Sequence, residues 1–239
     1  MKTSLLATFT AAMIAVLAGS TAPPAAANDP QKLIEDSAAL AKSLLSDSDW
    51  ANFHKYFGRA EAVVLAPDFL KVGLFFGGAG GQCVMIARDP DGGDWTAPSF
   101  CLMGEASFGL QIGVEKLEIM LMIMKRGALD RIISGTAKLG GEAGMSIGLI
   151  GQAVEGGTTL NLDADIIAFA RGQGFYGGLI IEGGYIGPDS EYNHAYYGRP
   201  VTARNILIDH MVDSPHAQVL REVLEAGVGL QRTSANAAD

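Results

Sequence analysis

The sequence predicts a single α+β domain in which a glycine-rich antiparallel sheet curves into a sandwich or a partly closed barrel, with N-terminal, middle and C-terminal helices. Three observations predict this fold. The 239 residues include 31 glycines, nearly twice the average usage of about 7%. Between residues 60 and 187, short apolar runs alternate with glycines, which mark kinks and bulges within strands. The connections between these runs are mostly short, which favours antiparallel pairing over alternating strand–helix units.

The N-terminus has the order of features that is typical of a secretory signal peptide. Lys2 gives a positive start, Leu5 to Gly19 is apolar, and Ala25-Ala26-Ala27 offers a small-residue cleavage site. The apolar run is short for a membrane span, and an uncleaved anchor is the alternative. We therefore expect residues 1–27 to be removed and the protein to be exported, either to the periplasm or as a secreted protein, with peripheral attachment to the envelope. The domain would then span residues 28–231, with a flexible tail over residues 232–239.

The N-terminal stretch 30–57 is predicted to be helical. One largely apolar face follows the spacing of a helix and consists of Leu33, Ile34, Ser37, Leu40, Ala41, Leu44 and Leu45. Membrane-surface helices are usually rich in Lys and Arg, whereas this helix has a mixed-charge polar side, so packing on the domain is favoured over a membrane-surface role. Further helices are predicted over residues 127–134, 203–209 and 215–225, the last one ended by Gly227.

The strands are predicted from apolar runs with turn residues between them. They are Ala62–Ala66, Gly73–Ile86, Trp95–Leu102, Ser107–Glu115, Glu118–Met124, Gly144–Ile150, Leu160–Asn161, Asp165–Arg171 and Phe175–Ile186. No fixed period repeats along the chain and no linker divides it, which indicates one domain.

Export makes the two cysteines candidates for a disulfide, because disulfides persist outside the cytoplasm. Residues 90–94, Pro-Asp-Gly-Gly-Asp, form a strong turn signal between two strand-like runs. If Asp89 pairs with Trp95 in an antiparallel hairpin, Cys83 lies directly opposite Cys101, within the distance that a disulfide requires. A shift of one residue would separate them, and two small buried hydrophobic residues are the alternative.

Charge and motifs exclude several classes of function. The net charge is −9 without a basic block, so a nucleic-acid partner is not expected, and cleavage after Ala27 would remove Lys2 and make the chain more acidic. Phosphate-binding loops and nucleophile elbows are absent from the sequence. The four histidines are isolated and match no metal-ligand spacing. We therefore expect no catalytic residue, no metal site and no cofactor.

Several glycine-bearing motifs occur in a fixed order along the chain. They are Lys71-Val-Gly-Leu-Phe-Phe-Gly-Gly-Ala-Gly-Gly81, Asp94-Trp-Thr-Ala-Pro98, Ser107-Phe-Gly-Leu-Gln-Ile-Gly113, Phe169-Ala-Arg-Gly-Gln-Gly-Phe-Tyr-Gly-Gly178, Glu182-Gly183 and Asn193-His-Ala-Tyr-Tyr-Gly198. This series resembles the SYLF domain family, whose eukaryotic members include actin-patch regulators and whose bacterial members are exported. The resemblance covers roughly residues 34–207.

The resemblance implies a module that binds phospholipids, especially acidic headgroups, without catalysis. Cations near backbone donors hold phosphate oxygens, and Lys71 and Arg171 are the basic residues within the matching motifs. Lys125, Arg126 and Arg131 surround the start of the predicted middle helix and extend the candidate lipid-binding set. Actin binding belongs to the eukaryotic branch, so we expect no actin partner for an exported chain. The alternative is a structural or protein-interaction component of the cell envelope.

Overall fold

The computed structural model describes residues 29–46, 51–73, 76–90, 93–108, 113–135, 137–140, 144–150, 163–172 and 184–236. The elements, in chain order, are α2 (Pro30–Leu45), α3 (Ala51–Phe57), β1 (Ala62–Gly73), β2 (Phe76–Ala87), β3 (Ser99–Phe108), β4 (Gly113–Ile123), α4 (Arg126–Ile133), β5 (Ala137–Leu139), β6 (Ile147–Ile150), β7 (Ile166–Gly172), β8 (Gly184–Pro188), α5 (Ser190–Tyr197), α6 (Ala203–Leu207), the short 3₁₀ helix η2 (Pro215–Ala217) and α7 (Gln218–Asn236).

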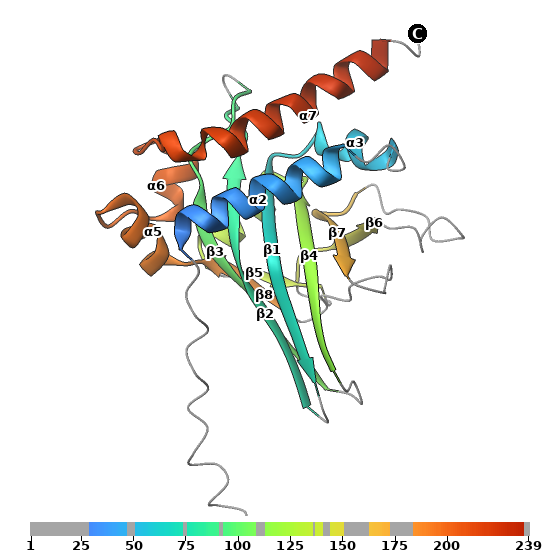
Figure 1. Ribbon diagram of the computed structural model, residues 1–239, viewed down its shortest axis with the longest axis vertical. Helices are drawn as coiled ribbons and strands as arrows, with labels where there is room; N and C mark the ends of the chain where they lie inside the picture. Colours follow the sequence, from blue (N-terminus) through green and yellow to red (C-terminus); the bar gives the residue numbers. More distant parts are fainter. Residues whose placement is uncertain are drawn as a thin grey trace, which may run out of the picture.

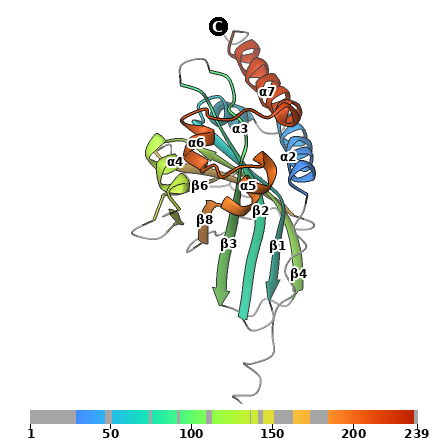
Figure 2. The same ribbon diagram turned by 90° about the vertical axis from the view of Figure 1, so that its left-hand side faces the viewer.

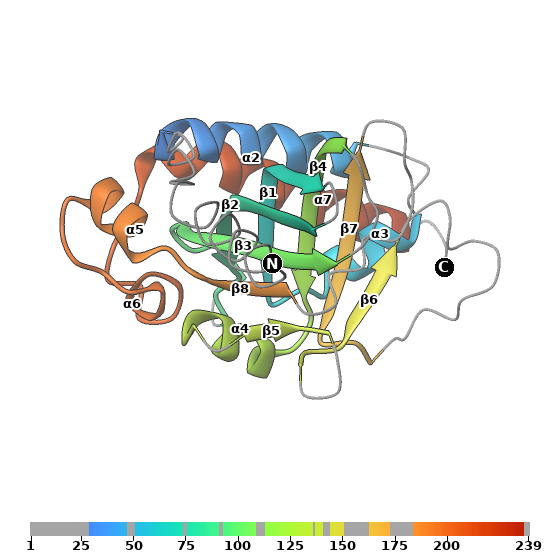
Figure 3. The same cartoon turned by 90° about the horizontal axis from the view of Figure 1, so that it is seen from below.

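The strands form one sheet in the order β5-β8-β3-β2-β1-β4-β7-β6. The sheet curls around a single interior (Figure 3), and a bridge between Leu139 of β5 and Met145, just before β6, brings its two ends together. These features confirm the predicted α+β domain with a curved, partly closed sheet. The sheet is mixed rather than purely antiparallel, because β6 runs parallel to β7.

The sheet has an apolar core on each of its two faces, because successive side chains of a strand point to opposite sides. Inward residues such as Val64 and Ile119 form one core with α4 and α6. Outward residues such as Val63 and Met120 form a second core beneath α2, α3 and α7. Figure 1 shows α2 and α7 lying across the upper part of the long strands. Strands β1–β4 continue well beyond these helices (Figure 2), so part of the outer face has no helical cover.

The N-terminal helical stretch is two helices rather than the single helix predicted over 30–57. α2 begins after Asp29, whose side chain accepts a hydrogen bond from the backbone N–H of Gln31, and it ends at Leu45. α3 starts at Ala51 as a separate helix. The predicted buried face of α2 is confirmed, since its apolar residues lie in the outer core.

α7 does not end at Gly227, where the sequence predicts its end, but continues to Asn236. Close packing explains the glycine. A Cβ atom at position 227 would lie 2.7 Å from both methyl carbons of Leu45 and 3.1 Å from the ring of Phe57. Gly227 therefore allows α7 to approach α2 and α3 closely and does not end the helix.

β1 is longer than the predicted strand Ala62–Ala66, because it passes through a bulge and continues to Gly73. The register against β4 shifts between Ala66 and Phe69. A Cβ atom on Gly81 of β2 would lie 2.5 Å from the carbonyl oxygen of Asp68 within this bulge. Gly81 thus leaves room for the bulged backbone, as glycine does where two backbones approach closely.

Other strand boundaries also differ from the prediction. The predicted break between Ser107–Glu115 and Glu118–Met124 is wrong, because β4 is continuous from Gly113 to Ile123. The polar residues that suggested the break are accommodated within the strand, where Lys116 forms an ion pair with Asp68. The predicted strand at residues 160–161 and most of the one at 175–186 lie outside the described residues, and so does the predicted signal segment 1–27.

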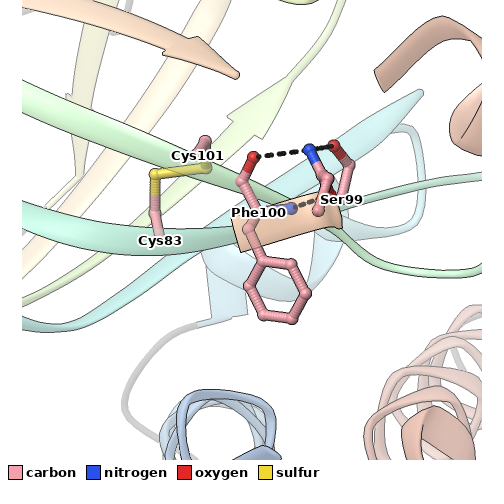
Figure 4. Close-up of a disulfide and its surroundings, with 5 residues drawn as sticks. Cys83, Ser99, Phe100 and Cys101 are labelled. Carbon is pink, nitrogen blue, oxygen red and sulfur yellow. Dashed lines mark hydrogen bonds between the residues drawn. A yellow bond between two sulfur atoms is a disulfide. The ribbon is translucent and has the colours of Figure 1, made fainter. Parts of the chain in front are cut away.

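The hairpin between β2 and β3 has the predicted register, with Cys83 opposite Cys101. The two residues are joined by a disulfide within the inner core (Figure 4). Nearer the turn the pairing differs from the prediction, since Trp95 bridges Arg88 and not Asp89. The register therefore changes by one residue between the turn and the cysteines, a detail that turn chemistry alone does not specify.

The sequence did not predict α5, which attaches to β3 through a buried amide. The side chain of Asn193 accepts a hydrogen bond from the backbone N–H of Phe100 at 3.0 Å and donates to the hydroxyl of Ser99 at 3.3 Å. β8 pairs with β3 only from Cys101 onward. The side-chain oxygen of Asn193 therefore supplies the acceptor that the backbone N–H of Phe100 would otherwise lack. Figure 4 shows the backbone of Phe100 engaged in these bonds beside the disulfide.

In the part of the chain that the structure describes, no helix is both long enough and apolar enough to cross a membrane.

Candidate functional site

The five cations predicted to bind lipid headgroups do not form one patch. Lys125 precedes α4, Arg126 is its first residue and Arg131 lies in its last turn, so these three belong to the region that follows the end of β4. This is the end of β4 that pairs with Ala62, whereas Lys71 lies near the other end of β1. About nine residues of extended strand separate the two ends, a distance of roughly 30 Å. A single anionic headgroup therefore cannot contact all five.

Arg171 is engaged by neighbouring side chains. Its Nε and Nη2 atoms donate to Oε2 of Glu118 at 2.8 and 2.5 Å, and its Nη1 donates to the hydroxyl of Ser43 at 3.1 Å. Glu118 is the register partner of Arg171 on β4, and Ser43 belongs to α2. The guanidinium thus joins β7, β4 and α2, and contact with a lipid phosphate would compete with these bonds.

Lys125 is engaged in a similar way. Its ammonium group lies 3.0 Å from Oδ1 of Asp165 and donates to the carbonyl of Asp163 at 2.6 Å. Burial alone would raise the pKa of Asp165, but hydrogen bonds from Ser146 and the charge of Lys125 outweigh burial and lower it. Of the cations around α4, Arg126 is half-buried and Arg131 is exposed.

Lys71 points inward at the far end of the barrel, between two carboxylates. It pairs in register with Glu115 on β4 and with Ala79 on β2, and Ala79 in turn pairs with Glu105 on β3. Burial raises the pKa of Glu105 and the charge of Lys71 opposes this effect. One carboxylate oxygen of Glu105, Oε2, is inaccessible to water and has no hydrogen-bond partner. The inner face at this end is therefore charged, unlike the apolar inner core above it.

The outer face at the same end is apolar and exposed. We call Leu70, Val72 and Val114 the distal cluster; their exposed fractions are 47%, 51% and 72%. Val72 and Val114 are register partners on β1 and β4, and Leu70 lies two residues from Val72 on the same side of β1. These strand ends lie beyond α2 and α7 (Figures 1 and 2). Exposed apolar side chains that gather in one place mark interaction sites far more often than single ones do.

Sequence reasoning missed the distal cluster, although a signal was present. The segments Leu70-Lys71-Val72 and Val114-Glu115-Lys116 alternate apolar and charged residues, as expected of strands with two different faces. Only the structure shows that the charged side of β1 points inward and the apolar side outward.

The aromatic residues of the matching motifs serve packing. Trp95 is buried, stacks on Phe57 and lies beneath the guanidinium of Arg88. The Tyr197 hydroxyl donates to the carbonyl of Pro98 at 2.6 Å, and burial raises the pKa of this phenol. These contacts assign both side chains to the fold. Among the described residues, no group of three His, Cys, Asp or Glu side chains is placed to hold a metal ion.

The domain is a curved sheet with helical cover on one part of its outer face. Comparison with known families assigns it, since the Ysc84 profile, described as "Las17-binding protein actin regulator", matches residues 104–227. This match covers just over half of the chain. The chain therefore belongs to the Ysc84 family, also called the SYLF family, which is a family of binding domains and not of enzymes.

Several curated proteins are similar to the chain. "LAS seventeen-binding protein 3" of Saccharomyces cerevisiae strain YJM789 is 31% identical over 160 residues, which cover 66% of this chain and 35% of that protein. "SH3 domain-containing YSC84-like protein 1" of Bos taurus is 27% identical over 158 residues, covering 66% and 46%. The protein of the same name from Homo sapiens matches at the same identity and coverage. The chain thus spans between a third and a half of the length of these relatives.

Proposed function

We propose that this domain is a non-catalytic module that binds phospholipid surfaces outside the cytoplasm, in the periplasm or after secretion. The observation that carries the proposal is the distal cluster, in which Leu70, Val72 and Val114 remain exposed at an end of the sheet that none of the described helices covers. The motif resemblance, which implies phospholipid binding, supports the same function. An exported location leaves actin outside the range of expected partners.

Vesicle flotation tests this function. The purified protein should lack residues 1–27, whose apolar run would itself enter vesicles, and every described element lies after them. We expect the protein to float with phospholipid vesicles and to remain at the bottom of the gradient without them. Mass spectrometry of lipids extracted from the purified protein provides an independent measurement. A protein that neither floats with vesicles nor carries lipid would contradict the proposal.

Protein interaction within the envelope is the second candidate, favoured by the names of relatives that are said to bind Las17. Removing α2 to test a docking role would expose the outer core, because Leu33, Ile34 and Leu44 are buried beneath it. Substitution of the exposed Glu35 and Lys42 on the outer side of α2 is the sharper test. Loss of a captured partner on these substitutions, with vesicle flotation absent, would favour this second function.

A further inference from the structure

We infer that the distal end of β1 and β4 enters the apolar layer of a phospholipid bilayer, with the distal cluster in contact with acyl chains. The inference rests on the proposed function and goes beyond it in two respects. It names the part of the fold that enters the lipid, and it makes apolar side chains rather than cations the main source of affinity.

The polarity of the inner face of β1 changes along the strand. In the helix-covered part, both faces of β1 are apolar, with Val64 inward and Val63 outward beneath the helices. At the distal end Lys71 points inward and Leu70 and Val72 point outward into solvent. A protein surrounded by water on all sides gains nothing from exposing its apolar side chains while its charged ones face inward. The arrangement is favourable when the outer surroundings are apolar.

β4 independently shows the same arrangement of a charged inner residue beside an apolar outer one. Glu115 is the register partner of Lys71 and points inward with it. The next residue pair, Val72 and Val114, points outward. Because β1 and β4 are adjacent and antiparallel, the two valines form one continuous apolar surface. Cross-strand neighbours of this kind lie about 5 Å apart. Two strands therefore present apolar side chains outward and charged side chains inward at the same level of the barrel.

The charge of the outer surface around the distal cluster also permits contact with a bilayer. Among the described residues, the ionised side chains next to the distal cluster on the outer face are Lys116, the register partner of Leu70, and Asp68. They form an ion pair with each other, so this part of the surface is neutral in a chain whose net charge is −9. Anionic headgroups therefore do not repel this end of the molecule, as they repel the acidic chain as a whole. Apolar burial supplies the attraction.

A bilayer suits this surface better than a partner protein does. The strands project past the helices and the distal cluster lies near their tips (Figures 1 and 2), so the end can enter a lipid layer without obstruction by the rest of the domain. By sequence, the residues that join β1 to β2 are Leu74-Phe75 and those that join β3 to β4 are Gly109-Leu-Gln-Ile112. None of these six residues is charged, and Gln111 is the only one of them with a polar side chain.

The experiment compares a distal variant with a matched control. V72S/V114S removes apolar area from the distal cluster, while V219S replaces a similarly exposed valine on α7. Flotation is measured with phosphatidylcholine vesicles, with and without phosphatidylglycerol. Salt is raised from about 0.1 M to about 1 M, which shortens the Debye length from about 10 to about 3 Å. We expect binding of the parent protein to both vesicle types at both salt concentrations, about tenfold or more weaker binding of V72S/V114S, and unchanged binding of V219S.

A depth measurement adds an independent readout. Tryptophan introduced as V114W should be quenched by phospholipids with brominated acyl chains, while tryptophan introduced as V219W should not. Circular dichroism of all four variants checks that the fold is retained, which the exposure of the replaced side chains favours. Quenching at position 114 alone, together with salt-insensitive flotation, would support the inference.

Three outcomes overturn it and separate it from the proposed function. Undiminished flotation of V72S/V114S without quenching at position 114 leaves lipid binding intact and assigns it to another surface. Flotation with anionic vesicles only, lost at high salt, assigns it to the cations. Absence of flotation, with a dimer of the parent protein that V72S/V114S converts to a monomer, assigns the distal cluster to self-association and contradicts the proposed function as well.

Discussion

The same four strands behave as two different structures along their length. In the helix-covered half, residues such as Phe100 and Met120 are buried on the outer face beneath α2, α3 and α7. In the distal half the outer face carries the exposed distal cluster beside the ion pair of Lys116 with Asp68, and the inner face carries Lys71, Glu105 and Glu115. The residues of each strand therefore match what covers each face: apolar side chains point outward in both halves, but among the described residues helices cover them only in the first half.

The largest expected effect is on the free energy of unfolding, to which the two halves should contribute very differently. Phe100 is fully buried and contacts the rings of Tyr192 and Tyr196. Phe100→Ala should lower the free energy of unfolding by about 3–5 kcal/mol, the usual cost of such a cavity. Val114→Ala, at the exposed distal end, should change it by less than about 0.5 kcal/mol. Urea denaturation followed by circular dichroism measures both, and a large loss for Val114→Ala would show that the distal cluster is packed within the protein.

The disulfide lies between the two halves. Its removal should have the next largest effect on stability. Cys83 and Cys101 are 18 residues apart in the sequence, and a crosslink that closes a loop of this size stabilises a protein by about 3 kcal/mol. C83A/C101A should lose about this amount, measured as a shift of the urea midpoint. Non-reducing and reducing mass measurements of the parent protein provide the control. Two free thiols in the purified protein, or an unchanged midpoint in the variant, would contradict the prediction.

Two glycines of β2 test the bulge at the border of the two halves, because Gly81 lies against it and Gly78 does not. Gly81→Ala would place its Cβ 2.5 Å from the carbonyl oxygen of Asp68, and the resulting strain should cost about 1–3 kcal/mol. Gly78→Ala meets only the carbonyl oxygen of Glu105 at 3.6 Å. It should be neutral or stabilising by up to about 1 kcal/mol, since glycine within a strand is unfavourable. Equal effects of the two substitutions in thermal unfolding would show that the bulge does not require Gly81.

Much of this architecture follows from local sequence, and the failures have physical causes. The pairing of Cys83 with Cys101 was predicted correctly, but the turn does not fix it, because Trp95 bridges Arg88 instead of Asp89 and the register changes by one residue before the cysteines. Gly227 was misjudged as a helix end because its close approach to Leu45 depends on how distant helices pack. The distal cluster was missed for a related reason. Alternation shows that Lys71 and Val72 point to opposite sides, but only the closed sheet defines which side is the interior.

The smallest expected effect concerns the inward charges of the distal half. Burial raises the pKa of Glu105 above its ordinary value, with Lys71 opposing the shift. A carboxyl whose pKa is raised by folding ionises more readily in the unfolded chain, so it destabilises the folded state once the pH exceeds its unfolded pKa. Glu105→Gln should therefore be slightly more stable than the parent at neutral pH, and this difference should vanish at acidic pH, below the ordinary pKa of glutamate. Lys71→Met should have the opposite effect at neutral pH, because it removes the charge that favours the ionised carboxylate. Thermal unfolding across this pH range measures both variants. A stability difference for Glu105→Gln that persists at acidic pH would mean that Glu105 acts through packing or hydrogen bonding, and the inner face of the distal half would then not be governed by charge.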